Sequence, residues 1–436
     1  MTPSMLVIAS AVILFFSICF LQIPIALLLA ALGLVGYALI DGWSNASMML
    51  GNEVWETLSS NSLAVIPLFV FMGQICFHSG LSARLYRSLS TYIGHRATGI
   101  PMATLIACAG FSSICGSNTA TAATMSTVAL PELKKRGYHP TFSTGMVSAG
   151  TTLGAVIPPS VVAIILSMQD PSMSVRALFI GGIIPGLMLL LFFMATVLIL
   201  AKLCPQWFPG TQQALGVDKK THAIYGLLET FSIFGLVVGG LTVGFFTPSE
   251  AGTIGCMLAI LMGFVSRGLN LQKLLTAARE SLNISAMIFL LLAGAGAYGK
   301  FLSISRAPFI IANAVGAFTE SPLAIILLIF AVLFVGSMIM DGLALLLITM
   351  PVFLPLVKAM HIDMVWFGLM LLVVTTMGAI SPPVGATAFV VSGVSRTPLE
   401  QVFKGAACFL PAYFVCLAVM LIFPDFITFL PNMFAR

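Results

Sequence analysis

An internal repeat constrains the fold of this chain more than any other feature of its sequence. A shift of 224 residues superposes the segment Thr151–Pro159 on Thr375–Pro383, and both segments end in a double proline. Self-similarity at one fixed offset is typical of a duplicated structural unit. The sequence therefore predicts two related halves joined by a polar, cytoplasmic link. We expect the first half at residues 1–200, the link at 201–222 and the second half at 223–436.

Apolar stretches long enough to cross a lipid bilayer recur in both halves. Of the 436 residues, 59% are hydrophobic and 8% are charged, whereas soluble domains carry roughly a quarter charged residues. A membrane-spanning helix needs about 20 predominantly apolar residues, and the short alternating segments of a membrane β-barrel do not occur. The fold class is therefore an all-α polytopic membrane protein. We expect membrane lipid as a partner and no nucleic acid.

Each half contains two interrupted helical segments. A polar or Gly-rich break divides an apolar stretch in each half, which predicts re-entrant helical hairpins at about 98–136 and 321–358. Two separate membrane spans would give the same distribution of charged residues on the two sides as a hairpin. The short helices before the breaks favour a hairpin. A double proline lacks two backbone donors, which predicts broken helices at about 140–168 and 364–394.

The distribution of basic residues predicts that the two halves are inverted. Lys and Arg accumulate on the cytoplasmic side of membrane proteins. With both ends of the first hairpin in the cytoplasm, 14 of the 19 Lys and Arg residues fall inside, and the second hairpin opens to the other side. Inverted repeats with broken helices are typical of secondary transporters, which bind substrate near the midplane at the breaks. The more polar segments 42–60 and 270–285 are predicted to be interfacial amphipathic helices.

Polar residues at the first hairpin tip are suited to binding ions. Ser117, Asn118 and Thr119 stand at the break, before the hydroxyl-rich segment 120–127 that contains Thr121. Side-chain and backbone oxygens freed there suit a hard cation such as sodium, and the N-terminal amides of the next helix suit a carboxylate. The alternative is that these Ser and Thr residues only cap and pack the helix.

The second tip and the two proline breaks supply the other candidate residues. Asp341 and Gly342 stand at the second tip, and Asp341 has three possible roles: cation ligand, proton carrier or helix cap. Pro158 belongs to a break that leaves upstream carbonyls free, and Gly154 and Gly378 permit close approach of the tips. The alternative is that these breaks are kinks used only for packing.

Glu250 has a simpler interpretation than the residues at the tips. It follows Thr247 and Pro248 in the order typical of a helix N-terminus. We therefore predict that Glu250 caps a helix.

Motifs from end to end of the chain resemble one family, the large membrane subunit of tripartite ATP-independent periplasmic (TRAP) transporters. The matching segments are Ile66–Phe69, Gly116–Ala123, Gly154–Ser160, Phe246–Ala251, Pro351–Pro355 and Gly378–Gly385. The resemblance implies an elevator-type, sodium-coupled importer of a small organic acid in the bacterial inner membrane. It also implies two partners, a small four-helix membrane subunit and a periplasmic substrate-binding protein, and no cofactor other than sodium as the coupling ion.

The resemblance also implies positions for the binding sites. The sodium ligands map onto Ser117, Asn118, Gly154, Pro158, Gly336, Gly378, Ser381 and Val384. The substrate contacts map onto Ser117, Asn118, Thr119, Thr121, Asp341, Gly342 and Thr387. Ser381 stands where threonine is more usual in the family, and this change keeps the hydroxyl group.

Three alternative functions remain open from the sequence. A stand-alone sodium/divalent-anion symporter of the same superfamily shares the Ser-Asn-Thr tip, but it would carry a second Ser-Asn-Thr where this chain has Asp341-Gly342. An ion channel is distinguished by flux that does not saturate. An intramembrane enzyme needs a convergent nucleophile and base, and the sequence offers no such pair. No nucleotide-binding GxxxxGK[ST] segment occurs, so we expect no ATP hydrolysis.

Overall fold

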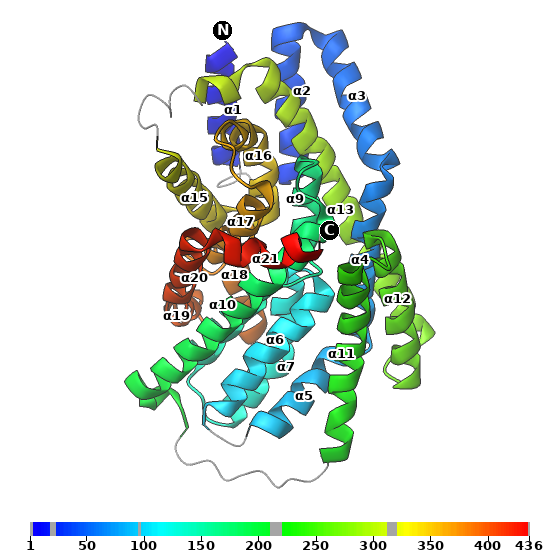
Figure 1. Cartoon of the computed structure of the whole chain (residues 1–436), viewed down its shortest axis with the longest axis vertical. Helices are drawn as coiled ribbons and strands as arrows, with labels where there is room; N and C mark the ends of the chain where they lie inside the picture. The colour runs from blue at the N-terminus through cyan, green and yellow to red at the C-terminus, as the bar shows by residue number, and fades with distance from the viewer. Residues whose placement is uncertain (1–2, 18–22, 95–96, 210–219, 312–320, 435–436) are drawn as a thin grey trace.

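The structure is a computed structural model that describes residues 3–17, 23–94, 97–209, 220–311 and 321–434. These residues form helices and connecting segments and contain no strand (Figure 1). The α-helices of the first half are α1 (Pro3–Phe16), α2 (Ile25–Asp41), α3 (Trp43–Ser59), α4 (Val65–His78), α5 (Leu81–Ile93), α6 (Gly99–Cys115), α7 (Asn118–Lys135), α8 (Pro140–Thr151), α9 (Val161–Gln169) and α10 (Val175–Leu203). Those of the second half are α11 (Lys220–Val243), α12 (Pro248–Val265), α13 (Leu271–Ile304), α15 (Pro322–Ile339), α16 (Gly342–Ala359), α17 (Met364–Gly378), α18 (Ala386–Ser395), α19 (Leu399–Ala407), α20 (Leu410–Ile422) and α21 (Pro424–Phe434).

Many of these helices are suited to a membrane. By length and composition, six helices in the described part of the chain can cross a bilayer, or up to eight if each of two bent pairs counts as one span. The six lie in α10, α11, α12, α13, α15 and α16. The prediction of an all-α polytopic membrane protein is confirmed.

Helix boundaries in the two halves follow the 224-residue shift seen in the sequence. Helix α7 covers 118–135 and α16 covers 342–359, so their ends correspond residue for residue. The pairs α2 and α12, α6 and α15, α8 and α17, and α9 and α18 begin within one or two residues of the same offset. Both double prolines, Pro158-Pro159 and Pro382-Pro383, are cis.

Two predicted segments differ from the structure in their boundaries. The link is shorter than predicted, because α10 extends to Leu203 and α11 begins at Lys220; residues 210–219 of the link lie outside the described residues. The segment 270–285 is not a separate helix, because it continues without a break into the 34-residue helix α13. Its counterpart α3 does end, at Ser59, and the following helical segment is bent from it by 59°.

The two halves interlock through their broken helices. Helix α18, which follows the second break, packs against α7 and α8 of the first half. In the same way, α9 follows the first break and packs against α16 of the second half. In Figure 1, α6 and α7 lie in the lower half of the molecule and α15 and α16 in the upper half, with α18 at the level between them. The ends of all four interrupted segments therefore meet near the centre.

Candidate functional site

A small cavity lies where the interrupted segments of both halves meet. Its lining comes from the start of α7, the start of α16 and both proline breaks. The lining residues are Asn118, Thr119, Ala155, Val162, Asp341, Gly342, Leu343, Thr375, Thr376, Ala379, Ala386 and Thr387. We call this the tip cavity. It has a volume of about 20 Å³, which is room for about one water.

A tight turn at Gly116 forms the first tip. Gly116 ends α6 with a φ of 63°, a left-handed conformation that glycine adopts without steric cost. Ser117 then caps α7, because its Oγ accepts a hydrogen bond from the Ala120 N–H at 3.4 Å. The Thr121 hydroxyl donates to the Ser117 carbonyl at 2.8 Å and is fully buried. Ser117 and Thr121 therefore hold the helix start in place, and neither lines the tip cavity.

Two buried oxygens beside this tip have no hydrogen-bond partner within the described part of the chain. They are the Asn118 Oδ1 and the Ser112 Oγ atoms. Both atoms face Gly154: a Cβ placed on Gly154 would lie 3.3 Å from Asn118 Oδ1 and 3.4 Å from Ser112 Oγ. A buried polar atom without a partner is costly. This arrangement of neutral oxygens is suited to a hard monovalent cation.

The second tip is capped by its carboxylate. The Asp341 Oδ2 accepts a hydrogen bond from the Leu343 N–H at 3.0 Å, at the N-terminus of α16. The Asp341 side chain remains exposed and lines the tip cavity. Gly342 lies close to the second broken helix, since its Cβ would be 3.0 Å from Thr375 Cβ. Helix capping by Asp341 is confirmed, and its carboxylate also lies beside the cavity.

The second break is tightly packed against α15. A Cβ on Gly378 would lie 1.9 Å from Ser337 Oγ and 2.5 Å from the Ser337 carbonyl carbon, so only glycine allows this approach. The Val384 N–H donates to the Met338 carbonyl at 3.1 Å, and the buried Ser381 hydroxyl donates to the Met377 carbonyl at 2.9 Å. The backbone of the break is thus bonded to the end of α15, just before the second tip.

Each broken helix has a buried threonine at the same place in the repeat, and its hydroxyl group bonds back to its own helix. The Thr152 hydroxyl donates to the Ala149 carbonyl at 2.6 Å, and Thr376, 224 residues later, donates to the Val373 carbonyl at 2.7 Å. The buried phenol of Tyr413 is hydrogen bonded to the Thr152 hydroxyl.

A second connection joins the halves beside the tip cavity. Ser148 of α8 and Thr387 of α18 have hydroxyl oxygens 3.4 Å apart, and the Thr387 hydroxyl also donates to the Ala379 carbonyl at 2.7 Å. The second break is therefore hydrogen bonded to α8, the helix that leads into the first break.

The structure brings together most, but not all, of the residues predicted from the sequence. Asn118, Thr119, Asp341, Gly342 and Thr387 line the tip cavity. Of the predicted cation ligands, Gly154 lies beside the Asn118 oxygen, and Gly378 lies against Ser337.

Other predicted ligands lie close to the breaks. The Cδ of Pro158 is 3.6 Å from the position of a Cβ on Gly182, so α10 packs against this break. The Gly336 carbonyl accepts a hydrogen bond from the Met340 N–H at 3.1 Å. The Val384 side chain is 44% exposed, so its backbone is the part held at the site.

Several residues that belong to this site carry weaker signals in the sequence. Ser112 lies one helical turn before Gly116, whose N–H donates to the Ser112 carbonyl at 2.8 Å; a search for hydroxyl groups one turn before each tip would have identified it. Thr375 and Thr376 lie inside the repeated segment, so the repeat itself indicates them. Tyr413 has no counterpart in the first half, where the shift reaches Leu189, and no local motif indicates its role.

Comparison with known proteins identifies relatives of this chain. Residues 12–426 match the family described as "Tripartite ATP-independent periplasmic transporter, DctM component". The chain is 30% identical over 406 residues to the C4-dicarboxylate TRAP transporter large permease protein DctM of Pseudomonas aeruginosa, covering 92% of this chain and 94% of that protein. It is also 30% identical to the isethionate TRAP transporter permease protein DctMQ of Oleidesulfovibrio alaskensis over 95% of this chain, and it spans 64% of the length of that relative.

A solved structure shares the fold. The YdaH transporter of Alcanivorax borkumensis superposes with a TM-score of 0.68 at 15% identity, covering 92% of this chain and 97% of that one. The relatives named above are permease proteins and not enzymes.

Proposed function

This chain belongs to the DctM component family of tripartite ATP-independent periplasmic transporters, and from that premise we propose that it imports a small organic acid together with sodium. In this proposal it is the large subunit of a transporter in the bacterial inner membrane. A periplasmic binding protein delivers the solute, and a small four-helix subunit completes the membrane part. The named solutes of its relatives, isethionate and C4-dicarboxylates, support a small carboxylate or sulfonate as the cargo.

The convergence of both tips and both breaks on one cavity is the observation that carries this proposal. Interrupted backbone is tolerated at membrane depth only where it lines a cavity or is buried in protein. Here Asn118 and Asp341, from opposite halves, line the same cavity. The unpartnered oxygens of Ser112 and Asn118 beside Gly154 support a cation site next to it.

The charges at this site give a physical reason for coupling. Helices α7 and α16 begin at the tip cavity, and their N-terminal amides favour an anion. The Asp341 carboxylate opposes an anion, since like charges at short range repel. Sodium held by Asn118 and Ser112, and a second cation near Gly378 and Ser381, would offset that repulsion. An acidic solute then binds well only together with sodium, which prevents either from moving alone.

The alternating-access step in this proposal is an elevator motion. The hairpins and broken helices, which are bonded to one another through Thr387, Ser148 and Met338, move as a unit. They slide past a scaffold in which α2 packs against α13 and α4 against α12. In the loaded unit the cations offset the charges of Asp341 and the acid, which lowers the cost of moving the site across the lipid.

Uptake into proteoliposomes tests this proposal. The chain is reconstituted with its small subunit and its binding protein, and the solute is the one recovered from that binding protein. We expect accumulation to require an inward sodium gradient. Asn118→Ala is expected to raise the sodium concentration for half-maximal uptake by about tenfold, since a charged group loses one ligand. Asn45→Ala, on the exposed face of α3, is the control. Sodium dependence that is identical in Asn118→Ala and the wild type would overturn the assignment.

A further inference from the structure

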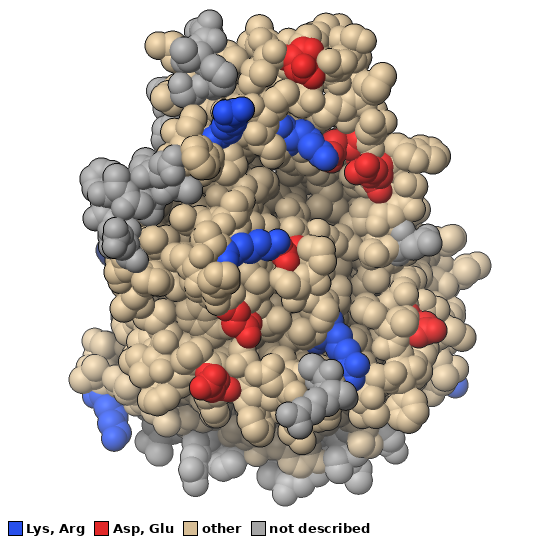
Figure 2. All heavy atoms as spheres, turned by 45° about the horizontal axis from the view of Figure 1, so that its top comes forward, with Lys and Arg blue, Asp and Glu red and all other residues tan. Residues whose placement is uncertain are grey.

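A second and larger pocket opens on the face of the molecule to which α3, α9, α13 and α16 contribute. Its volume is about 440 Å³, which is within the range of small-molecule sites. Figure 2 shows that basic and acidic side chains gather beside a hollow on this face. The wall formed by α3 and α13 belongs to the proposed scaffold, since α3 packs against α2 and α13. The wall formed by α9 and α16 belongs to the proposed moving unit. We call this cavity the outer pocket.

The outer pocket and the tip cavity share two helices. Val162 of α9 and Leu343 of α16 line the tip cavity, whereas Gln169 of α9 and Pro351 of α16 line the outer pocket. A helix rises 1.5 Å per residue, so the two cavities lie about 10 Å apart along the same pair of helices. A solute in the outer pocket therefore lies beside the helices that lead to the tip cavity.

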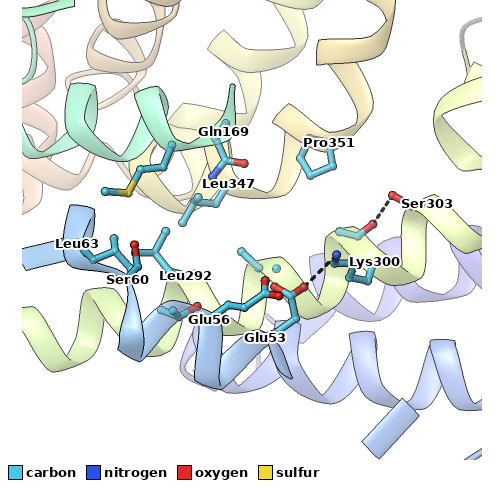
Figure 3. A pocket seen from close by; sticks show the side chains of 15 residues that line it. Glu53, Glu56, Ser60, Leu63, Gln169, Leu292, Lys300, Ser303, Leu347 and Pro351 are labelled. Atoms are coloured by element: carbon cyan, nitrogen blue, oxygen red, sulfur yellow. Dashed lines mark hydrogen bonds and ion pairs between the residues drawn. The ribbon is translucent and has the colours of Figure 1, made fainter. Parts of the chain in front are cut away.

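One wall of the outer pocket carries opposite charges in a fixed arrangement. Glu53 Oε1 of α3 lies 3.4 Å from Lys300 Nζ of α13, with the Glu53 side chain 13% exposed and the Lys300 side chain 57% exposed. Glu53 is seated tightly against α13, because a Cβ on Gly296 would lie 2.3 Å from its Oε2. Figure 3 shows Lys300 reaching toward Glu53 from the neighbouring helix.

A second carboxylate beside this pair has no partner in the part of the chain that the structure describes. Glu56 lies one helical turn after Glu53, on the same face of α3 (Figure 3). It is exposed, and no hydrogen bond or ion pair of its side chain occurs among the described residues. The pocket thus presents a free carboxylate at one point and, close to it, a largely exposed ammonium group. Gln169 adds an amide from the opposite wall.

We infer that the outer pocket binds a small zwitterionic solute, with its anionic group at Lys300 and its cationic group at Glu56. A dianion meets two carboxylates and one ammonium group here and is disfavoured by like-charge repulsion. A dication places one cationic group beside Lys300, where like-charge repulsion disfavours it. This inference deepens the proposed function and rests on it, because it names the class of acid: a carboxylate or sulfonate that also carries a cationic group.

Three probes of matched length test the inference. The probes share a four-carbon chain and differ in charge. Succinate carries two negative charges, 4-aminobutyrate carries one charge of each sign, and 1,4-diaminobutane carries two positive charges. Each probe is titrated by calorimetry into the full chain in lipid nanodiscs, without sodium and without partner proteins. We expect 4-aminobutyrate to bind about tenfold more tightly than either of the others, as an added pair of charge contacts requires.

Charge-neutral variants identify the groups responsible. Glu56→Gln is expected to reduce the preference for 4-aminobutyrate over succinate by about tenfold, and Lys300→Gln is expected to reduce its preference over the diamine. Glu400→Gln is the matched control, because Glu400 forms an exposed pair with Lys404 at 2.8 Å on α19, away from the outer pocket. It should leave all three affinities unchanged.

Three results would overturn the inference. The first is succinate binding as tightly as 4-aminobutyrate to the wild type. The second is a ranking of the probes that survives Glu56→Gln. The third is that no probe shows saturable binding, while Glu56→Gln and Lys300→Gln both weaken capture of the binding protein. That result would make the outer pocket a protein docking surface. The titration needs neither sodium nor uptake, so its failure is distinguishable from failure of the proposed sodium coupling.

Discussion

Adding one methyl group at Gly154 tests the cation site with little change to the rest of the fold. A Cβ at this position would lie 3.1 Å from Ser112 Cβ and 3.3 Å from Asn118 Oδ1. The methyl group would thus occupy the space on which the two unpartnered oxygens converge. A contact between a charged group and a neutral dipole contributes about 1.5–3 kcal/mol. We therefore expect Gly154→Ala to weaken sodium binding by about tenfold to a hundredfold.

The same variant should remain folded. The nearest atoms belong to side chains that need to shift by only a few tenths of an ångström. Replacing glycine by alanine also lowers the conformational entropy of the unfolded chain, which stabilises the folded state by about 0.4–1 kcal/mol. Gly378→Ala is different, because its Cβ would lie 2.5 Å from the backbone carbon of Ser337. That clash forces α15 and α17 apart, and overpacking of this kind costs at least about 1–3 kcal/mol.

Binding of radioactive sodium to the purified chain, together with its thermal unfolding, separates these effects. We expect Gly154→Ala to lose sodium affinity without melting earlier than the wild type, and Gly378→Ala to melt earlier. Gly235→Ala is the control, since no atom lies within 4 Å of its added Cβ. The reasoning is wrong if Gly154→Ala binds sodium like the wild type, or if Gly378→Ala melts like the wild type.

Three further predictions follow from individual contacts. Tyr413→Phe removes the buried hydrogen bond to a threonine of the first broken helix and should cost about 1 kcal/mol of unfolding free energy. It should also weaken sodium binding, whereas Tyr298→Phe, which loses a contact of 3.1 Å in the scaffold, should affect only the melting temperature. In the loop before α10, burial raises the pKa of Asp170, but the hydrogen bond and charge of Lys358 outweigh it, so the net pKa is lowered. The stabilisation by Asp170 is therefore present above the ordinary aspartate value of about 3.9 and lost as pH falls through the lower folded pKa; melting curves at falling pH should lose this acid dependence in Asp170→Asn. Thr247→Ala breaks the capping box of α12 and should cost about 1 kcal/mol in denaturation experiments, with Thr247→Ser close to the wild type.

The sequence determines much of the architecture because local signals and the repeat agree. Apolar length, proline pairs and glycine-rich breaks are local features, and they locate the ends of α6, α7, α15 and α16 to within a few residues. Capping by Glu250 was predicted on the same basis and is confirmed by the hydrogen bonds of Thr247. These elements follow from the chemistry of neighbouring residues.

Contacts between distant segments were beyond sequence reasoning. The continuity of α13 through residue 285 depends on packing along α2 and α4, which periodicity in one segment does not encode. The outer pocket joins Glu53 to Lys300 across 247 positions of the chain, and no repeat relates them. Tyr413 reaches Thr152 from a part of the second half whose counterpart is Leu189. Such pairs become visible only when the helices are assembled.

Cross-linking of the two tips tests most directly whether both halves form one central site. Cysteines replace Asn118 and Asp341 in a chain whose eight native cysteines have been changed to serine or alanine. A short bis-methanethiosulfonate is then applied to the protein in membranes. We predict rapid linkage of the two tips, because positions 118 and 341 line the same small cavity. Two cysteines that react singly and never with each other would contradict the account.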